Sequence, residues 1–338
     1  MDKCFVLTAD IDLSSYDNWK PIGSFVPISD APEDEETPVL ELTFTGVFDG
    51  GGHKISNIKI DEPERAAVGL FGCIAGDAGS VLNLTVENAD VRGAMLVAGV
   101  VGYDRGPIIR NVRLIGDNDV KGGFLVGGIV GGGFCDTVDC EAQANVTLFG
   151  DGAQGVGVLA GGMETCDIID CSATGRVTVT GTDCMSIGGL SGAAHNSENV
   201  LRCVSDVVIT VGEGNMMIGG LLGHAGMEES AGDTPTLISD CSATAVITAP
   251  ASAERIGGIV GGGFFTQAYR EYRPEPGANR VVDCVTAGEI SGGKIVGAII
   301  GYAYDNSTLE GCASTMTANG ASDLIGATSD QVPLDELR

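Results

Sequence analysis

The chain has 338 residues, of which 18 are Lys or Arg and 46 are Asp or Glu, so its formal net charge is −28. This charge argues against binding to nucleic acid, which requires Lys and Arg to neutralise phosphates, and against attraction to an anionic membrane surface. A hydrophobic fraction of 43% excludes a disordered chain, and no apolar run reaches the ~18 residues of a membrane-spanning helix.

The first 60 residues lack the repeat that fills the rest of the chain, and we expect them to form an N-terminal cap. An acidic run over residues 30–36 is expected to be a solvated loop. His53 lies in a Gly-Gly-His-Lys-Ile turn and is interpreted as a structural residue. Because the sequence opens without an apolar signal segment, the chain is either cytosolic or the mature part of an exported protein.

Glycine marks a repeat in residues 61–338. A pentapeptide of two small residues, an aliphatic residue, any residue and a closing glycine recurs along this region. The closing glycines of the eight copies are Gly72, Gly102, Gly131, Gly161, Gly192, Gly223, Gly261 and Gly301. A fading last copy occupies residues 324–327. Repeats of about 30 residues indicate a solenoid, which we expect to continue from the cap as one domain.

A second column keeps step with the glycines and indicates the type of solenoid. Its members in the last six repeats are Cys140, Cys171, Cys203, Cys241, Cys284 and Cys312. Small or β-branched residues follow at positions two and six and polar ones at position seven, and this alternation predicts strands. Like residues in consecutive repeats predict parallel coils about 4.8 Å apart. We therefore predict an all-β fold, a parallel β-helix of about eight coils, with the cysteines forming a core ladder.

The sixth and seventh repeats contain insertions at the same corner. The separation between closing glycine and column cysteine is 9 to 11 residues in ordinary repeats, 18 from Gly223 to Cys241 and 23 from Gly261 to Cys284. Insertions on one face of a solenoid are frequent binding surfaces, and aromatic and Arg side chains are frequent hot spots. The longer insertion carries the residues that we predict to bind a ligand: Phe265, Tyr269, Arg270, Tyr272 and Arg273. The alternative is a loop whose aromatic side chains pack onto the solenoid.

The glycine pentapeptides resemble the GLUG motif, a repeat of bacterial secreted and surface proteins, over roughly residues 40–328. Residues 7–13, 19–23, 44–50 and 52–57 are similar to the lead-in of such proteins. The resemblance implies a right-handed parallel β-helix, an extracellular or cell-surface location in a bacterium, and adhesin-like roles. It brings no catalytic residues.

The cysteines and histidines do not form a pattern typical of a metal site or a catalytic triad. Stacked cysteines about 4.8 Å apart exceed the usual Cβ separation of a disulfide, so we expect reduced thiols in the core. Cys135 and Cys166 share a register in neighbouring coils, and a disulfide between them stays open. No short Cys and His spacing typical of zinc occurs. His195 and His224 follow pentapeptide copies at unequal offsets, and we expect them in loops.

The carboxylates are spread along the chain and form one outward column. Its members, Asp139, Asp170, Asp240 and Asp283, each precede a column cysteine. Like charges stacked in register repel, so a bound Ca²⁺ there stays open, although we expect no cofactor.

The sequence therefore predicts a non-catalytic surface or secreted module that binds a ligand or acts as a rigid spacer. Its expected partners are a glycan or a host or cell-surface protein. The alternative is a carbohydrate-active β-helix enzyme, a polysaccharide lyase or glycoside hydrolase, for which clustered carboxylates in a groove would be needed.

Overall fold

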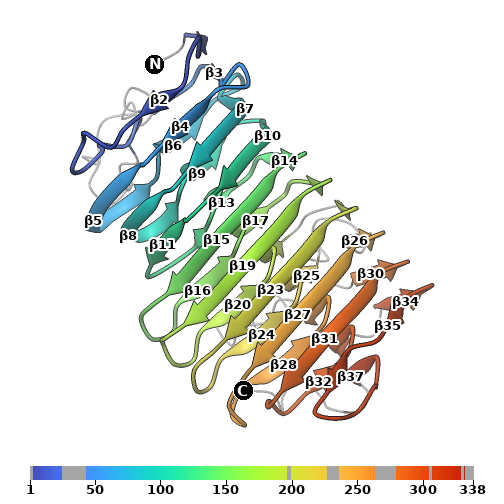
Figure 1. Cartoon of the computed structure of the whole chain (residues 1–338). Helices are drawn as coiled ribbons and strands as arrows, with labels where there is room; N and C mark the ends of the chain where they lie inside the picture. The colour runs from blue at the N-terminus through green and yellow to red at the C-terminus, as the bar shows by residue number, and fades with distance from the viewer. Residues whose placement is uncertain are drawn as a thin grey trace, which may run out of the picture.

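The computed structural model describes residues 3–24, 43–195, 199–226, 236–262, 279–303, 307–328 and 331. Within these residues all regular structure is β-strand, in a 28-stranded sheet (sheet A) and a nine-stranded sheet (sheet B). Every pair of strands that the two sheets contain is parallel, and Figure 1 shows the strands stacked along one axis. The predicted parallel β-helix is confirmed. No described segment is a helix that could cross a membrane.

One regular coil contributes three strands to sheet A and one to sheet B. The short first strands are β14 (Asp136–Val138), β18 (Ile168–Ile169), β22 (Asn199–Leu201), β26 (Thr236–Ser239), β30 (Asn279–Val282) and β34 (Thr308–Glu310). The long second strands are β15 (Glu141–Leu148), β19 (Ser172–Val179), β23 (Val204–Thr210), β27 (Ser242–Thr248) and β31 (Val285–Ser291). The third strands are β12 (Val126–Gly127), β16 (Gln154–Gly157), β20 (Met185–Gly188), β24 (Met216–Gly219), β28 (Glu254–Gly257) and β32 (Val296–Gly297).

Sheet B follows a sharp bend and runs the length of the rod. Its strands are β6 (Phe71–Ala75), β9 (Val101–Arg105), β13 (Val130–Gly133), β17 (Ala160–Glu164), β21 (Ser191–His195), β25 (Leu222–Gly226), β29 (Val260–Gly262), β33 (Ile300–Ala303) and β37 (Ile325–Thr328). The last of these is formed by the fading pentapeptide copy.

The two ends of sheet A are less regular. The N-terminal strands are β1 (Phe5–Val6), β2 (Ile11–Asp12), β3 (Val47–Asp49), β4 (Lys54–Ser56), β5 (Lys59–Val68), β7 (Ser80–Glu87), β8 (Asp90–Ala98), β10 (Ile108–Ile115) and β11 (Asp119–Gly122). The C-terminal strands are β35 (Ala313–Ser314) and β36 (Thr317–Ala318). Because β1 pairs with β3 and β2 with β4, the N-terminal segment adds to the first coil as further parallel strands.

The repeated glycines allow the backbones of the two sheets to meet at the bend. A Cβ on Gly127 would lie 2.1 Å from the carbonyl oxygen of Val130, and one on Gly131 would lie 2.5 Å from that of Gly102. Neither position can hold a side chain, because the obstructing atoms belong to the backbone. The aliphatic residue between them, Ile129 in this copy, is fully buried and fills the interior. The pentapeptide thus encodes the bend between sheets A and B.

The column cysteines lie inside the rod, where each thiol donates to two carbonyl oxygens. Cys241 Sγ lies 3.2 Å from the oxygen of Ser239 in its own coil and 3.5 Å from that of Val200 in the preceding coil. The same pair of acceptors recurs at the other five column cysteines. Five of the six are buried, and Cys312 is half-buried. All eleven cysteines are free thiols, Cys135 and Cys166 included.

Candidate functional site

The five residues that the sequence singled out for ligand binding lie outside the described residues. Phe265, Tyr269, Arg270, Tyr272 and Arg273 belong to the segment 263–278, which follows β29 and precedes β30. Their role therefore stays a prediction. The described part of the chain instead shows a trough on the outer face of sheet B.

Residues with little or no side chain form the floor of this trough. One outward file of sheet B runs through consecutive coils, one residue after each closing glycine: Tyr103, Gly132, Gly162, Ala193 and His224. Three small residues in succession leave a depression, which is limited at one end by Tyr103 and at the other by His224. The ends are four coils apart, or about 19 Å at a spacing of about 4.8 Å. The trough therefore runs along the rod and across the strands.

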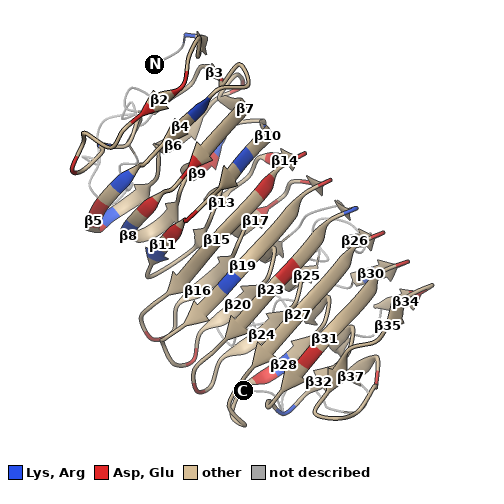
Figure 2. Ribbon diagram, viewed as in Figure 1, with Lys and Arg blue, Asp and Glu red and all other residues tan. Residues whose placement is uncertain are grey.

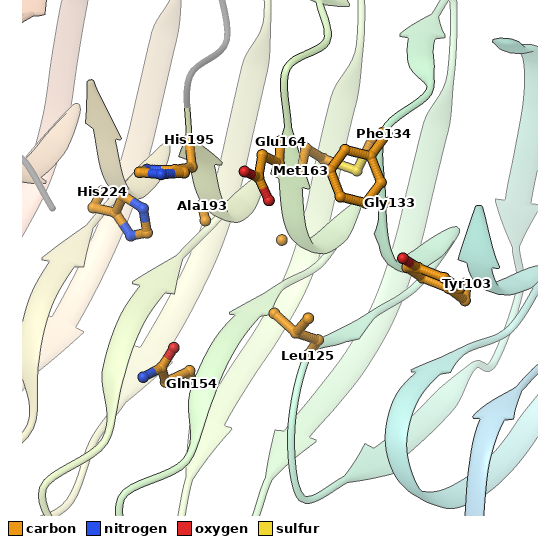
Figure 3. Close-up of a pocket in the computed structure, with 11 residues that line it drawn as sticks. Tyr103, Leu125, Gly133, Phe134, Gln154, Met163, Glu164, Ala193, His195 and His224 are labelled. Carbon is orange, nitrogen blue, oxygen red and sulfur yellow. The ribbon is translucent and has the colours of Figure 1, made fainter. Parts of the chain in front are cut away.

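Two rows of side chains form the walls, as Figure 3 shows. One wall is formed by Glu164 and His195, which are paired in β17 and β21, and by Phe134, which directly follows β13. The other is the corner between sheets A and B, which contributes Leu125 and Gln154. The volume between the walls is about 270 Å³. The result is an open, elongated site with apolar surface and a few hydrogen-bonding groups.

An aromatic pair forms one end of the trough. The ring centroids of Tyr103 and Phe134 lie 6.5 Å apart with an interplanar angle of 76°, and the Phe134 side chain is exposed. Such edge-to-face contacts favour a fixed orientation of both rings. The exposed ring of Phe134 therefore provides a rigid apolar surface at the mouth of the trough.

Histidines form the other end, and the prediction that they lie in loops is wrong. His195 is the last residue of β21, and His224 lies within β25. Their rings meet edge to face, with centroids 5.8 Å apart. Burial, followed by the neighbouring His195 and Arg255, holds the pKa of His224 well below its usual range, so this imidazole is neutral at neutral pH. Their unequal offsets from the closing glycine reflect two different outward files of one sheet.

A column of residues with left-handed backbone conformation lies at the corner between sheets A and B and positions the wall that contains Leu125. Leu96, Leu125, Ser186, Met217 and Arg255 each have a φ between 55° and 63° or, at Leu125, of 49°. This conformation is uncommon for residues other than glycine, and here it turns each side chain towards the outer face of sheet B. A Cβ built on Gly132 would lie 2.9 Å from Cδ1 of Leu125, so the leucine packs on the glycine floor.

A buried carboxyl lies beneath the aromatic end of the trough. Asp104 follows Tyr103 in β9, points inward and is fully buried. One oxygen accepts the backbone N–H of Gly106 at 2.6 Å, whereas the other has no partner among the described residues. Burial raises the pKa of Asp104 to about 7. This side chain is therefore a source of pH-dependent stability next to the site.

The outward acidic column has a structural explanation that the sequence did not show. Asp139, Asp170, Asp240 and Asp283 all adopt the left-handed conformation, with φ between 51° and 56°. Asp and Asn tolerate this conformation better than other non-glycine residues. Arg202 takes the same place in one coil and donates two hydrogen bonds to Asp170, at 2.7 and 2.8 Å. Figure 2 shows acidic residues at the tips of β14, β26 and β30.

No metal centre occurs in the part of the chain that the structure describes, where no group of three or more His, Cys, Asp or Glu side chains could hold an ion. The aspartates of the outward column thus occupy turn positions without converging on one point.

Comparison with known proteins supports the repeat. A GLUG motif matches residues 152–180, which run from β16 to the end of β19 and so span about one coil. Halomucin of Haloquadratum walsbyi is 42% identical over 112 residues, a segment that covers 32% of this chain and 1% of Halomucin. The resemblance to GLUG-repeat proteins is therefore confirmed, and the matched region is a very small part of that relative. No solved structure matches the chain.

Proposed function

We propose that this protein is a non-catalytic module of a cell-surface or secreted repeat protein and that it binds a linear glycan in the trough of sheet B. The GLUG motif and the similarity to Halomucin support a cell-surface repeat protein. The observation that carries the glycan proposal is the run of Gly132, Gly162 and Ala193 between Tyr103 and His224, which leaves an open path across several coils.

The chemistry of the trough fits a chain of sugar rings. The C–H bonds on the face of a pyranose are weakly positive, and they complement the negative faces of aromatic rings such as Phe134 and Tyr103. Hydroxyl groups along the chain can donate to the carboxylate of Glu164 and exchange hydrogen bonds with Gln154 and His195. A mainly apolar lining with a few such groups is typical of small-molecule sites.

The position of the trough favours a glycan over an extended peptide. Peptides that bind β-proteins as added strands need a free sheet edge, where backbone donors and acceptors are exposed. The trough instead lies on the face of sheet B, where β13, β17 and β21 already pair with strands on both sides. Recognition there depends on side chains, and rings can stack on side chains without backbone pairing.

The single carboxylate among the described lining residues of the trough favours binding over hydrolysis. A glycoside hydrolase uses two carboxyl groups on either side of the scissile bond, about 5 to 9.5 Å apart. Among the described residues that line the trough, Glu164 is the single carboxylate. The proposed role is therefore recognition along a rigid face.

A glycan array followed by titration with the best oligosaccharide tests this proposal. Ala193→Trp fills the floor of the trough one coil before His224 and is expected to weaken binding at least tenfold, because the indole occupies the path of the ligand. Thr174→Trp, on the exposed outer face of sheet A, is the matched control and should bind like the wild type. Equal binding by both variants, or depolymerisation of the glycan by the wild type, would reject the proposal.

The inserted segment gives a second, separate test. Replacement of Tyr269, Arg270, Tyr272 and Arg273 with alanine is expected to abolish binding if the insertion contributes to the same surface, with nearly unchanged thermal stability. A ligand that binds this variant as well as the wild type would restrict the site to the trough.

A further inference from the structure

A buried arginine lies one coil beyond the histidine end of the trough. Arg255 is the second residue of β28 (Glu254–Gly257) and belongs to the left-handed corner column, with φ of 58°. Its side chain is fully buried and is the largest such side chain among the described residues. A Cβ on Gly262 would lie 3.9 Å from Cδ of Arg255, so the arginine stem packs on the outer face of sheet B at the empty position of β29.

The guanidinium of Arg255 is poorly satisfied within the described chain. Nη2 donates to the thioether sulfur of Met216 at 2.9 Å, which is a weak acceptor. Nε and Nη1 find no hydrogen-bond partner among the residues that the structure places. The neighbouring carboxylate of Glu254 is bound instead to Lys294, at 2.8 Å. The remaining positions around Arg255 therefore offer donors without acceptors.

Such an arrangement is costly without a ligand. A guanidinium stays charged in proteins, so burial cannot be relieved by loss of a proton. Buried charges are normally paired, and an unpaired one opposes folding. The adjacent His224 is neutral and gives no compensating charge. Groups that carry such strain are typical of binding sites, in which the ligand supplies the missing partner.

We propose that Arg255 is the anchor of a site for a small oxyanion group, a carboxylate or a sulfate, that completes the hydrogen bonds of Nε and Nη1. Charge-assisted hydrogen bonds from arginine to such groups are strong, and they gain further strength where water is excluded. This site is independent of the trough proposal, because simple anions are sufficient probes. An anion on a sugar chain and a free anion share this chemistry, and the choice of probes distinguishes them.

Thermal unfolding of the full chain tests the site at constant ionic strength, with chloride replaced by sulfate, acetate or glucuronate. The wild type should gain about 2 °C or more in Tm, in a saturable manner, beyond the gain of Arg255→Met. In chloride alone, Arg255→Met should unfold at a higher temperature than the wild type, because the variant removes a buried charge that has no acidic partner among the described residues. Arg176→Met removes an exposed charge from the outer face of sheet A and should respond to anions like the wild type.

Acetate and glucuronate together separate the two sources of the anion, a free oxyanion and an acidic sugar. A larger response to glucuronate than to acetate assigns the site to an acidic sugar, and equal responses assign it to a free oxyanion. Arg255→Lys keeps the charge and should retain part of the response, which keeps the test valid if Arg255→Met folds poorly. Equal anion responses in the wild type and both variants, or no response in the wild type, would overturn the proposal.

Discussion

The hydroxyl oxygen of Ser186 lies 2.7 Å from Nδ1 of His224, and both side chains are buried where the corner column meets sheet B. Ser186 adopts a left-handed conformation, which directs its side chain towards the imidazole of the next coil. This hydrogen bond fixes the ring that limits one end of the trough. It also shows how a residue in the corner of one coil positions a side chain in the sheet of the following coil.

Removal of this hydroxyl should destabilise the fold. In Ser186→Ala, His224 loses this buried hydrogen bond, and we expect the free energy of unfolding to fall by about 1–3 kcal/mol. Urea denaturation measures this change. Thr174→Ala, in an exposed position of sheet A, should change stability by less than about 0.5 kcal/mol. Equal effects of the two substitutions would show that the Ser186 contact contributes nothing.

Asp104 should make stability fall as the pH rises towards neutrality. Its pKa is about 7 in the folded chain and 3.8 in the reference state, so the folded protein binds the extra proton between these values. The contribution of the protonated group is complete below about pH 4 and is lost as the pH rises through 7. Asp104→Asn should remove this dependence and gain stability relative to the wild type at pH 8, on the order of 2–4 kcal/mol.

Denaturation curves from pH 4 to 8 measure the difference between wild type and Asp104→Asn. Asp117→Asn, at an exposed position, is the matched control and should give a profile parallel to that of the wild type. Parallel profiles for all three proteins would show that Asp104 titrates as an ordinary carboxyl.

The left-handed turn positions of the outward acidic column should reject a β-branched residue. Asp139 has φ of 54°, so Asp139→Val should lower the free energy of unfolding by about 1–2 kcal/mol, whereas Asp139→Gly should be nearly neutral. Thr174→Val makes a comparable change in an extended strand and should be tolerated. The conformational explanation would be wrong if Asp139→Asn were less stable than the wild type and if added Ca²⁺ stabilised the wild type but not this variant. The acidic column would then be an ion site.

All eleven thiols should be free, and very few should react in the folded protein. The hydrogen bond with the Cys203 thiol, together with burial, raises the pKa of Cys241 to about 12, which removes the reactive thiolate at neutral pH. In the native chain we expect rapid labelling of the exposed Cys4 only, followed slowly by the half-buried Cys312. After unfolding without a reductant, all eleven should label. Fewer than six free thiols would contradict a reduced ladder.

The fold was predictable from the sequence because its determinants recur in every coil. Gly127 and Gly131 are fixed by backbone contacts that each coil repeats, and Cys171 and Cys203 occupy equivalent interior positions. A steric requirement that is repeated along one axis leaves a periodic trace. The period in turn predicts parallel stacking.

The trough was not predicted, because it depends on departures from the repeat. The column one residue after the closing glycine contains Tyr103, then Gly132, Gly162 and Ala193, then His224. Three small residues in one column do not stand out in a chain that contains 53 glycines. The two histidines lie in different files, so their unequal offsets from the closing glycine predict loops. An alignment of that column with outward-facing strand positions would have revealed the large–small–large pattern.

The left-handed conformation of Asp139 and its equivalents was also hidden. A stacked acidic column suggested a cation, whereas Asn83 and Asn111 in earlier coils share the conformation without the charge. The common property of these residues is their tolerance of positive φ, which the charge of the aspartates does not indicate.

The most direct test of the trough is the affinity of the wild-type protein for one glycan at increasing chain length, measured by calorimetry. Affinity should rise with each added sugar until the chain spans the distance from Tyr103 to His224, about 19 Å, and should then stay constant. Ala193→Trp should abolish this dependence. Affinity that is independent of chain length, or a length dependence that persists in Ala193→Trp, would contradict binding along the trough.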